Sequence, residues 1–205
     1  MNQLTDALHI PDTQSERDER HLAIQRVGVK DVRYPLSLTV AGAVQQTAAR
    51  WNLDVALPAD QKGTHMSRFV AWLEEQTEPL DAPRLQAQLE HMLDKLHAQD
   101  GRVEARFEFF IRKRAPVSGL QSLLDYAGAW IAERRDGRLA LWAEVGVPVK
   151  SLCPCSKEIS DYGAHNQRSL VTIRVELLDD SLGLAELVRA AELSASSEIW
   201  PLLKR

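Results

Sequence analysis

Two cysteines separated by one proline, followed by a histidine, are the residues of this chain best suited to chemistry. Both cysteines of the chain, Cys153 and Cys155, lie in segment 151–168, and His165 follows in the polar run 163–167, which is predicted as loop. Strand-like apolar runs flank the segment, so a thiolate and an imidazole on one connection between paired strands can converge on a metal ion. Catalytic zinc sites use three protein ligands and leave a fourth position for water. A third ligand, most naturally a carboxylate, is therefore expected further along the chain.

The spacing alone leaves a structural interpretation open. A single cysteine is more often a small buried apolar residue than a ligand, and Cys-Pro-Cys lacks the two cysteine pairs of a zinc ribbon. One intervening proline makes Cys153 and Cys155 poor disulfide partners for each other. With no further cysteine to pair with, a reduced intracellular chain is expected.

The composition is that of a globular protein and excludes some classes of partner. Of the 205 residues, 44% are hydrophobic and 26% are charged, and the formal net charge is −4. This acidic balance argues against broad binding to nucleic acid or to membrane surfaces, although a local basic cluster could still bind a small anion. The sequence shows no apolar run long enough to span a membrane and no secretory signal pattern. We expect a cytoplasmic protein of one large domain or two closely joined halves.

Apolar periodicity predicts alternating pairs of strands and helices. Strands are expected at 22–40, 44–55, 103–111, 120–133, 139–149 and 170–177, and helices at 64–76, 81–99 and 181–194. Ala41-Gly42 and Asp136-Gly137 are typical of tight turns, and Asp81 is a helix N-cap with proline in the first turn. The order is ββααββ followed by ββα, a repeat of architecture without a repeat of sequence.

This order divides the chain into a flexible leader at 1–21, a first module at 22–135 and a second, incomplete module at 136–205. The apolar run 199–203 is an unusual place for a domain to end. We therefore expect either that the chain is a fragment or that partner elements come from elsewhere.

Four sequence strings resemble one known family. They are LCPCSKEIS…YGAHNQRS around Cys153, KGTHMSRF at 62–69, RAPVSG at 114–119 and SSEIWPLLKR at 196–205. Together they resemble the type IB GTP cyclohydrolases of the tunnelling-fold superfamily, whose repeated unit is ββααββ. The resemblance covers 22–205 and implies an α+β fold with an antiparallel sheet and helices on one face. Members of the family continue past the position of Arg205, so the chain resembles a member that lacks the C-terminal segment.

The resemblance also implies a reaction and a set of ligands. The family converts GTP and water to 7,8-dihydroneopterin triphosphate and formate, the first step of tetrahydrofolate and pterin biosynthesis. It uses one divalent metal ion per site, here Zn²⁺, Mn²⁺ or Fe²⁺, held by a cysteine, a histidine and a glutamate. These match Cys153, His165 and Glu198, with Cys153 and His165 also in the catalytic role, and Cys155 is expected to support the site from outside the ligand set. Tunnelling folds assemble into rings with sites between subunits, and a homotetramer is expected.

The triphosphate of GTP requires cations. His65 is expected at a helix start, where backbone N–H groups favour an anion. The other selected candidates are Arg114, Lys157, Arg168 and Lys204, with Arg112, Lys113 and Arg205 as further basic residues nearby in sequence. The alternative for each is an ordinary solvated surface charge.

Two rival functions remain at this stage. One is a nitrile reductase of the same fold with a cysteine nucleophile, which would need a nicotinamide site and a sequence string that this chain lacks. The other is a metal-binding assembly module without catalytic activity.

Overall fold

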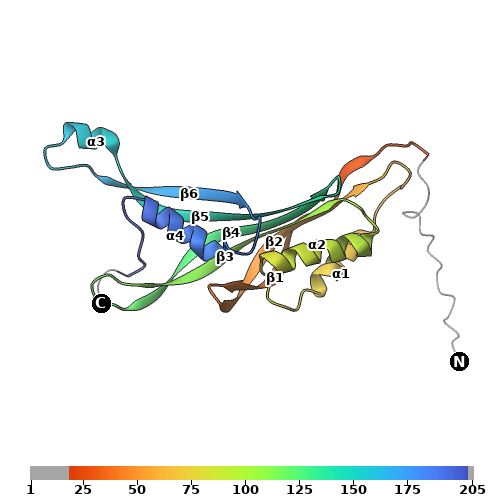
Figure 1. The fold of residues 1–205 in the computed structure, drawn as a ribbon, viewed down its shortest axis with the longest axis horizontal. Coiled ribbons are helices and arrows are strands. Elements are labelled where there is room, and N and C mark those ends of the chain that lie inside the picture. The colour runs from red at the N-terminus through yellow and green to blue at the C-terminus, as the bar shows by residue number, and fades with distance from the viewer. Residues whose placement is uncertain (1–18, 203–205) are drawn as a thin grey trace, which may run out of the picture.

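The computed structural model describes residues 19–202, and these form a long sheet with helices packed below it (Figure 1). In chain order the elements are β1 (Ile24–Val40), β2 (Ala43–Leu57), α1 (Met66–Glu74), α2 (Ala82–Leu96), β3 (Gly101–Arg114), β4 (Gln121–Arg135), β5 (Arg138–Leu152), α3 (Pro154–Ile159), β6 (Asn166–Glu176) and α4 (Leu184–Ser194). Among the described residues, none of the helices combines the length and apolar character needed to cross a bilayer.

The six strands form one antiparallel sheet in the order of the chain. Two of the hairpins turn on the dipeptides expected from the sequence: Ala41 and Gly42 have φ of 49° and 76°, and Asp136 and Gly137 have φ of 51° and 75°. Two successive left-handed residues are what a tight turn with the twist of a β-hairpin requires. The local sequence therefore sets the register next to both turns, while the β1–β2 register shifts further along, between Val29 and Val32 and between Ile24 and Val27.

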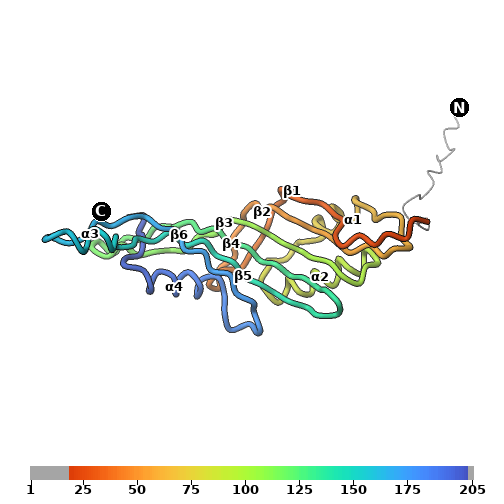
Figure 2. The backbone as a smooth tube through the Cα atoms, turned by 90° about the horizontal axis from the view of Figure 1, so that it is seen from above, coloured from red at the N-terminus to blue at the C-terminus, as the bar shows by residue number. Residues whose placement is uncertain are grey.

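Helices α1, α2 and α4 cover one face of the sheet and enclose the core (Figures 1 and 2). Asp81 caps α2 by accepting a hydrogen bond from the backbone N–H of Arg84 at 2.9 Å. Between α1 and β2, Trp72 meets the edge of Trp51 with ring centroids 5.8 Å apart, and both side chains are buried. Such an aromatic pair stabilises the fold beyond the area that it buries.

At one end of the molecule the sheet forks. Strands β4 and β5 pair only as far as Ala127 and Gly146. Beyond that point the β3–β4 hairpin continues alone to Arg114 opposite Gln121, and the β5–β6 pair continues to Leu152 opposite Asn166. Figure 1 shows the two hairpins diverging, and in both Figures 1 and 2 α3 lies at the far tip of the β5–β6 hairpin. We call this tip the α3 arm (residues 150–168).

The segment that follows α4 lies within this fork. Ser197 forms an isolated antiparallel bridge with Lys150 of β5, with backbone hydrogen bonds of 2.9 and 3.2 Å. The hydroxyl of Ser196 also accepts a hydrogen bond from the backbone N–H of Leu152 at 3.1 Å. The residues after α4 thus replace β4 as the neighbour of β5 at this end.

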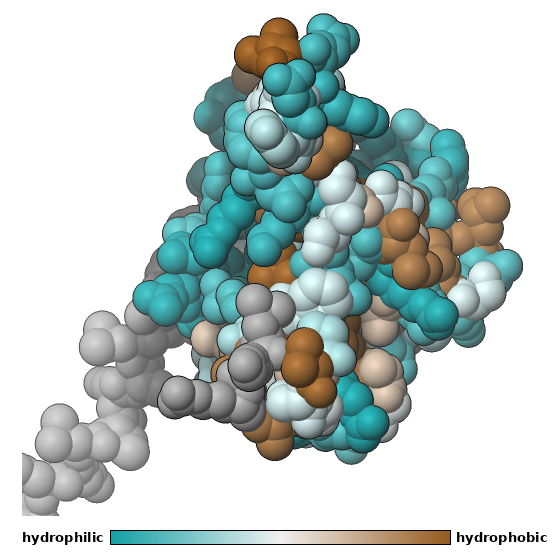
Figure 3. Space-filling model, turned by 90° about the vertical axis from the view of Figure 1, so that its left-hand side faces the viewer, coloured by the Kyte–Doolittle hydropathy of each residue, from teal (hydrophilic) through white to brown (hydrophobic). Residues whose placement is uncertain are grey.

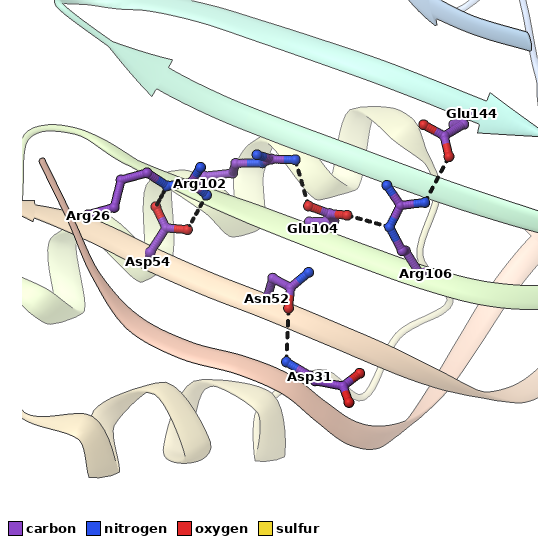
Figure 4. A network of polar contacts seen from close by, with 8 residues as sticks. All are labelled: Arg26, Asp31, Asn52, Asp54, Arg102, Glu104, Arg106 and Glu144. Carbon is purple, nitrogen blue, oxygen red and sulfur yellow. Dashed lines mark hydrogen bonds and ion pairs between the residues drawn. The ribbon is translucent and has the colours of Figure 1, made fainter.

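The face of the sheet opposite the helices carries a network of ion pairs (Figure 4). Glu104 is 6% exposed and accepts hydrogen bonds from Arg102 and Arg106, each at 2.5 Å. Arg106 extends the chain to Glu144 at 2.8 Å, and these contacts raise the pKa of the Arg106 guanidinium. A buried carboxylate is tolerated here because cations flank it on both sides.

The element order expected from the sequence is confirmed, and the class is α+β with an antiparallel sheet. The division into two modules stays a prediction, because one sheet and one core run through both. The expectation of a loop at 163–167 is wrong in part, since β6 begins at Asn166, and residues 154–159 form a short helix. The strand begins earlier because backbone pairing with β5 continues through these polar residues. The helix begins at Pro154 because proline has the fixed φ suited to a first helical position. The leader at 1–21 lies largely outside the described residues.

The network on the open face gives a first prediction. Replacing Glu104 by alanine leaves Arg102, whose side chain is 17% exposed, without its carboxylate. We expect the free energy of unfolding to fall by about 2 kcal/mol, below the value for a fully buried pair because Arg106 is half exposed. Urea unfolding at fixed protein concentration measures this change. Glu108→Ala, on the same strand and face but exposed, is the matched control, and a loss as large as that of Glu104→Ala would contradict the assignment.

Candidate active site

The register of the β5–β6 pair places Cys153 and His165 opposite each other. The last pair is Leu152 with Asn166, and the next residues continue the ladder, because the backbone N–H of Cys153 donates to the carbonyl oxygen of His165 at 3.2 Å. The chain leaves β5 at Cys153, the N-cap of α3, and re-enters the sheet directly after His165. A thiol and an imidazole therefore stand side by side at the base of the α3 arm.

The surroundings of Cys153 favour its thiolate. The pKa of the Cys153 thiol is lowered, chiefly because the Ser156 hydroxyl can donate to the sulfur, with further contributions from the backbone N–H groups of Ser156 and Cys155. The sulfur forms no helix-capping hydrogen bond of ordinary geometry, so these contacts are weak. Both thiols of the chain are free, and Cys155 is exposed. The thiolate is the form of cysteine that binds metals.

Ser156 also contacts the imidazole. Its Oγ lies 2.6 Å from Nδ1 of His165. Ser156 was not predicted as a site residue; its position two residues after Pro154, a residue suited to the first turn of a helix, was the available signal. Contact with Nδ1 leaves Nε2 as the ring nitrogen available to a ligand.

Glu198 belongs to the neighbouring segment but faces another partner. Its carboxylate accepts a hydrogen bond from Lys113 Nζ of β3 at 2.5 Å. The same ammonium donates to Glu192 at 2.7 Å and to the carbonyl oxygen of Ile199 at 3.0 Å, and it lies 5.6 Å from the centre of the Trp200 ring. Lys113 thereby ties α4 and the segment after it to the β3–β4 hairpin across the fork.

The hydroxyl of Tyr126 donates to Glu192 at 2.7 Å. We call Lys113, Glu192, Glu198 and Tyr126 together the lysine cluster. Burial, together with that hydrogen bond to a carboxylate, raises the pKa of Tyr126 well above its ordinary value. The tyrosine therefore stays protonated and can donate to Glu192. The lysine cluster pairs one ammonium with two carboxylates, so Glu192 can neutralise Lys113 without Glu198.

The other predicted substrate residues are distributed over both ends of the molecule. Lys157 and Arg168 are exposed on the α3 arm, where Arg168 pairs across the strands with Lys150. Arg114 is exposed at the end of β3, on the other hairpin of the fork. His65 is the N-cap residue of α1, which packs on β1 and α2 far from α3 (Figures 1 and 2). Lys204 and Arg205 lie outside the described residues.

One basic residue considered for the triphosphate is not available for it. The side chain of Lys113 is 8% exposed and is committed to Glu192 and Glu198. Its neighbours Arg112 and Arg114 are exposed, since alternation along β3 turns every second side chain toward the helices. Basic residues that are adjacent in sequence therefore differ in role.

The donors fit a divalent metal ion in part. A thiolate and an imidazole on facing backbone positions suit Zn²⁺ or Fe²⁺, and the lowered thiol pKa supports that chemistry. Glu198 is on the segment that pairs with β5, but its carboxylate points to Lys113. Within residues 19–202, no three histidine, cysteine, aspartate or glutamate side chains are close enough together to hold a metal ion. The three-ligand set remains a prediction.

The tip of the fork exposes several hydrophobic side chains. Ile159 at the end of α3 is 87% exposed, and Val117, Leu120 and Leu123 of the β3–β4 hairpin are also exposed. Viewed from this end, the surface is mostly hydrophilic, with hydrophobic side chains in separate groups (Figure 3). The surface around the α3 arm is therefore largely polar.

Comparison with known proteins gives a consistent result. The sequence model of the type I GTP cyclohydrolase FolE2 family matches residues 10–205. A protein of Methylibium petroleiphilum named GTP cyclohydrolase FolE2 is 63% identical, over 96% of this chain and 76% of the relative. Proteins of the same name from Burkholderia vietnamiensis and Paraburkholderia xenovorans are 58% and 57% identical, over 100% of this chain and 76% of each relative.

The lysine cluster gives the second prediction. Among the described residues, only Lys113 provides an ammonium that binds both Glu192 and Glu198. Lys113→Met removes this ammonium. Because Glu192, which is 12% exposed, and the more open Glu198, which is 35% exposed, then lose their shared cation, we expect a loss of about 2 kcal/mol in the free energy of unfolding. Hydrogen exchange should also show faster exchange of the Lys150 and Ser197 amides, which report the docking of the segment. Arg112→Met, one residue earlier on the exposed face, is the control; equal effects of the two variants would contradict the role given to Lys113.

Proposed function

The chain belongs to the type I GTP cyclohydrolase FolE2 family, and from that premise we propose that it hydrolyses GTP to 7,8-dihydroneopterin triphosphate and formate. The observation that carries the proposal is the family match over residues 10–205, joined to a thiol and an imidazole held on facing strand ends. The reaction would begin tetrahydrofolate biosynthesis. Free thiols at Cys153 and Cys155 suit a reducing compartment, and we place the protein in the cytoplasm.

We propose that Cys153 and His165 hold one divalent metal ion, with Glu198 as the third ligand. Such an ion, whether Zn²⁺, Mn²⁺ or Fe²⁺, supplies a Lewis acid that makes hydroxide available near neutral pH for attack on the purine. For Glu198 to take part, its carboxylate has to leave Lys113. That exchange is limited in cost because Glu192 stays bound to the same ammonium, supported by Tyr126.

The remaining residues of the arm are proposed to bind the substrate. Lys150 and Arg168 face each other across the β5–β6 pair, and Lys157 is exposed on α3 of the same arm, in a chain whose net charge is −4. We propose that Lys157 and Arg168 contact the triphosphate, with Arg114 and His65 contributing from other parts of the assembly and Lys204 from outside the described residues. Cys155, exposed one residue beyond Pro154, is proposed to support the arrangement of the arm.

We further propose a homo-oligomer, most simply a tetramer, with sites between subunits. Two features of the single chain support this. The α3 arm extends beyond the sheet, and Tyr162 on it is fully exposed. Helices α1 and α3, where predicted substrate residues lie, are towards opposite ends of the molecule (Figure 1). A second copy is a simple way to bring such residues to one substrate.

Two other functions remain distinguishable by experiment. A nitrile reductase with Cys153 as nucleophile would consume a nicotinamide cofactor and need no metal ion. A metal-binding assembly module would bind the ion tightly but would not bind GTP analogues. Equilibrium dialysis with a nonhydrolysable GTP analogue, with and without metal, separates the three possibilities.

The proposed function gives a third prediction. Cys153→Ser should lose bound metal and GTP hydrolysis together, because a hydroxyl remains protonated where the thiol provides a thiolate. Metal content is measured by elemental analysis after gel filtration, and formate release reports activity. Cys155→Ser is the matched control and should keep the stoichiometric metal of the parent. Full metal retention in Cys153→Ser would refute the ligand assignment.

A further inference from the structure

A serine that the proposed mechanism does not use lies between the two proposed metal donors. Ser156 is partly buried in α3, whereas its neighbours Cys155 and Lys157 are exposed. Its Oγ is 2.6 Å from His165 Nδ1, and Ser156 lies in the first turn of the helix whose N-cap residue is Cys153. One side chain therefore contacts the imidazole and lies within one helical turn of Cys153.

The chemistry of a hydroxyl allows it to serve both donors at once. A serine hydroxyl has one hydrogen to donate and two lone pairs that accept. If His165 carries its proton on Nδ1 and donates to Oγ, the hydroxyl hydrogen is free to point toward the sulfur. This arrangement leaves the Nε2 lone pair free, which is the form of the ring that binds a divalent ion.

The opposite arrangement would oppose metal binding. If the hydroxyl donated to Nδ1, the neutral ring would carry its proton on Nε2 and that nitrogen would have no lone pair for a ligand. The contact with Ser156 thus decides which ring nitrogen of His165 is left for a ligand.

We propose that Ser156 is a positioning residue that accepts a hydrogen bond from His165 Nδ1 and so fixes the Nδ1–H tautomer, which leaves Nε2 for the metal ion. The proposal rests on the proposed function for the identity of the ligand, but the tautomer can be measured without metal. Partners that orient a ligating histidine typically change metal affinity 10–100-fold when removed.

The test compares Ser156→Ala and Ser156→Thr with the parent protein. In the parent without metal, ¹⁵N NMR of labelled histidine should show His165 as the Nδ1–H tautomer. Ser156→Ala should shift it toward the Nε2–H tautomer usual for free histidine, and Ser156→Thr, which keeps the hydroxyl, should restore the parent spectrum. An Nε2–H tautomer in the parent, or no change in Ser156→Ala, would overturn the proposal.

Metal titration provides the second readout. Ser156→Ala should raise the Kd for Co²⁺ about 10–100-fold and weaken the sulfur-to-metal charge-transfer band, whereas Ser156→Thr should stay close to the parent. Ser160→Ala is the control, because Ser160 caps only the following turn through the backbone N–H of Tyr162. If the parent binds no Co²⁺ through sulfur, the proposed metal centre fails, and the NMR result still decides the role of Ser156. An unchanged Kd in Ser156→Ala would overturn the proposal.

Discussion

The register between β5 and β6 is the constraint on which the candidate site depends. Cys153 and His165 face each other only because Leu152 pairs with Asn166 and the backbone continues this ladder by one hydrogen bond. A slip of one residue would turn every side chain of one strand to the other face. Hydroxyl contact between Ser151 and Ser169, at 2.7 Å, and the bridge from Lys150 to Ser197 hold this register near the site, where the apolar core no longer reaches.

At the forked end of the sheet, polar contacts rather than apolar packing join the segments of the chain. Away from the fork, helices and buried aromatic side chains pack against the strands. Within the fork, Lys113 joins β3 to α4 and to the segment after it through two carboxylates and a carbonyl. Contacts of this kind can exchange partners at modest cost when one charge has two counter-ions, which is what the proposed role of Glu198 requires. The part of the fold that is proposed to carry the chemistry is thus the part held by polar contacts.

Much of the fold is predictable from local sequence. Asp136-Gly137 permits the left-handed turn between β4 and β5, Asp81 caps α2, and alternation along 103–111 distinguishes the buried from the wet face. Cys153 and His165 could be proposed as metal donors from residue type and spacing, because they share one hairpin and so depend on a short stretch of chain, and the resemblance to a family added Glu198. These features are recoverable because the residues that decide them lie near one another in sequence.

The rest depends on contacts between distant segments. Lys113 looked like one member of a basic run, and only its pairing with Glu192 and Glu198, some 80 residues later, shows that it is buried and neutralised. The contact of Glu198 with Lys113 could not be predicted either, because the distance in sequence between Glu198 and Cys153 gives no information about β3. Helix α3 was missed because 154–159 is too short for a periodic signal, and the contacts of Ser156 followed from that helix.

X-ray absorption at the metal edge tests the central claim most directly. The purified protein, reconstituted with Zn²⁺, should show one sulfur scatterer at about 2.3 Å and nitrogen or oxygen scatterers at about 2.0–2.1 Å. The sulfur contribution should disappear in Cys153→Ser and persist in Cys155→Ser. A first shell of nitrogen and oxygen alone in the parent protein would contradict a site built on Cys153 and His165.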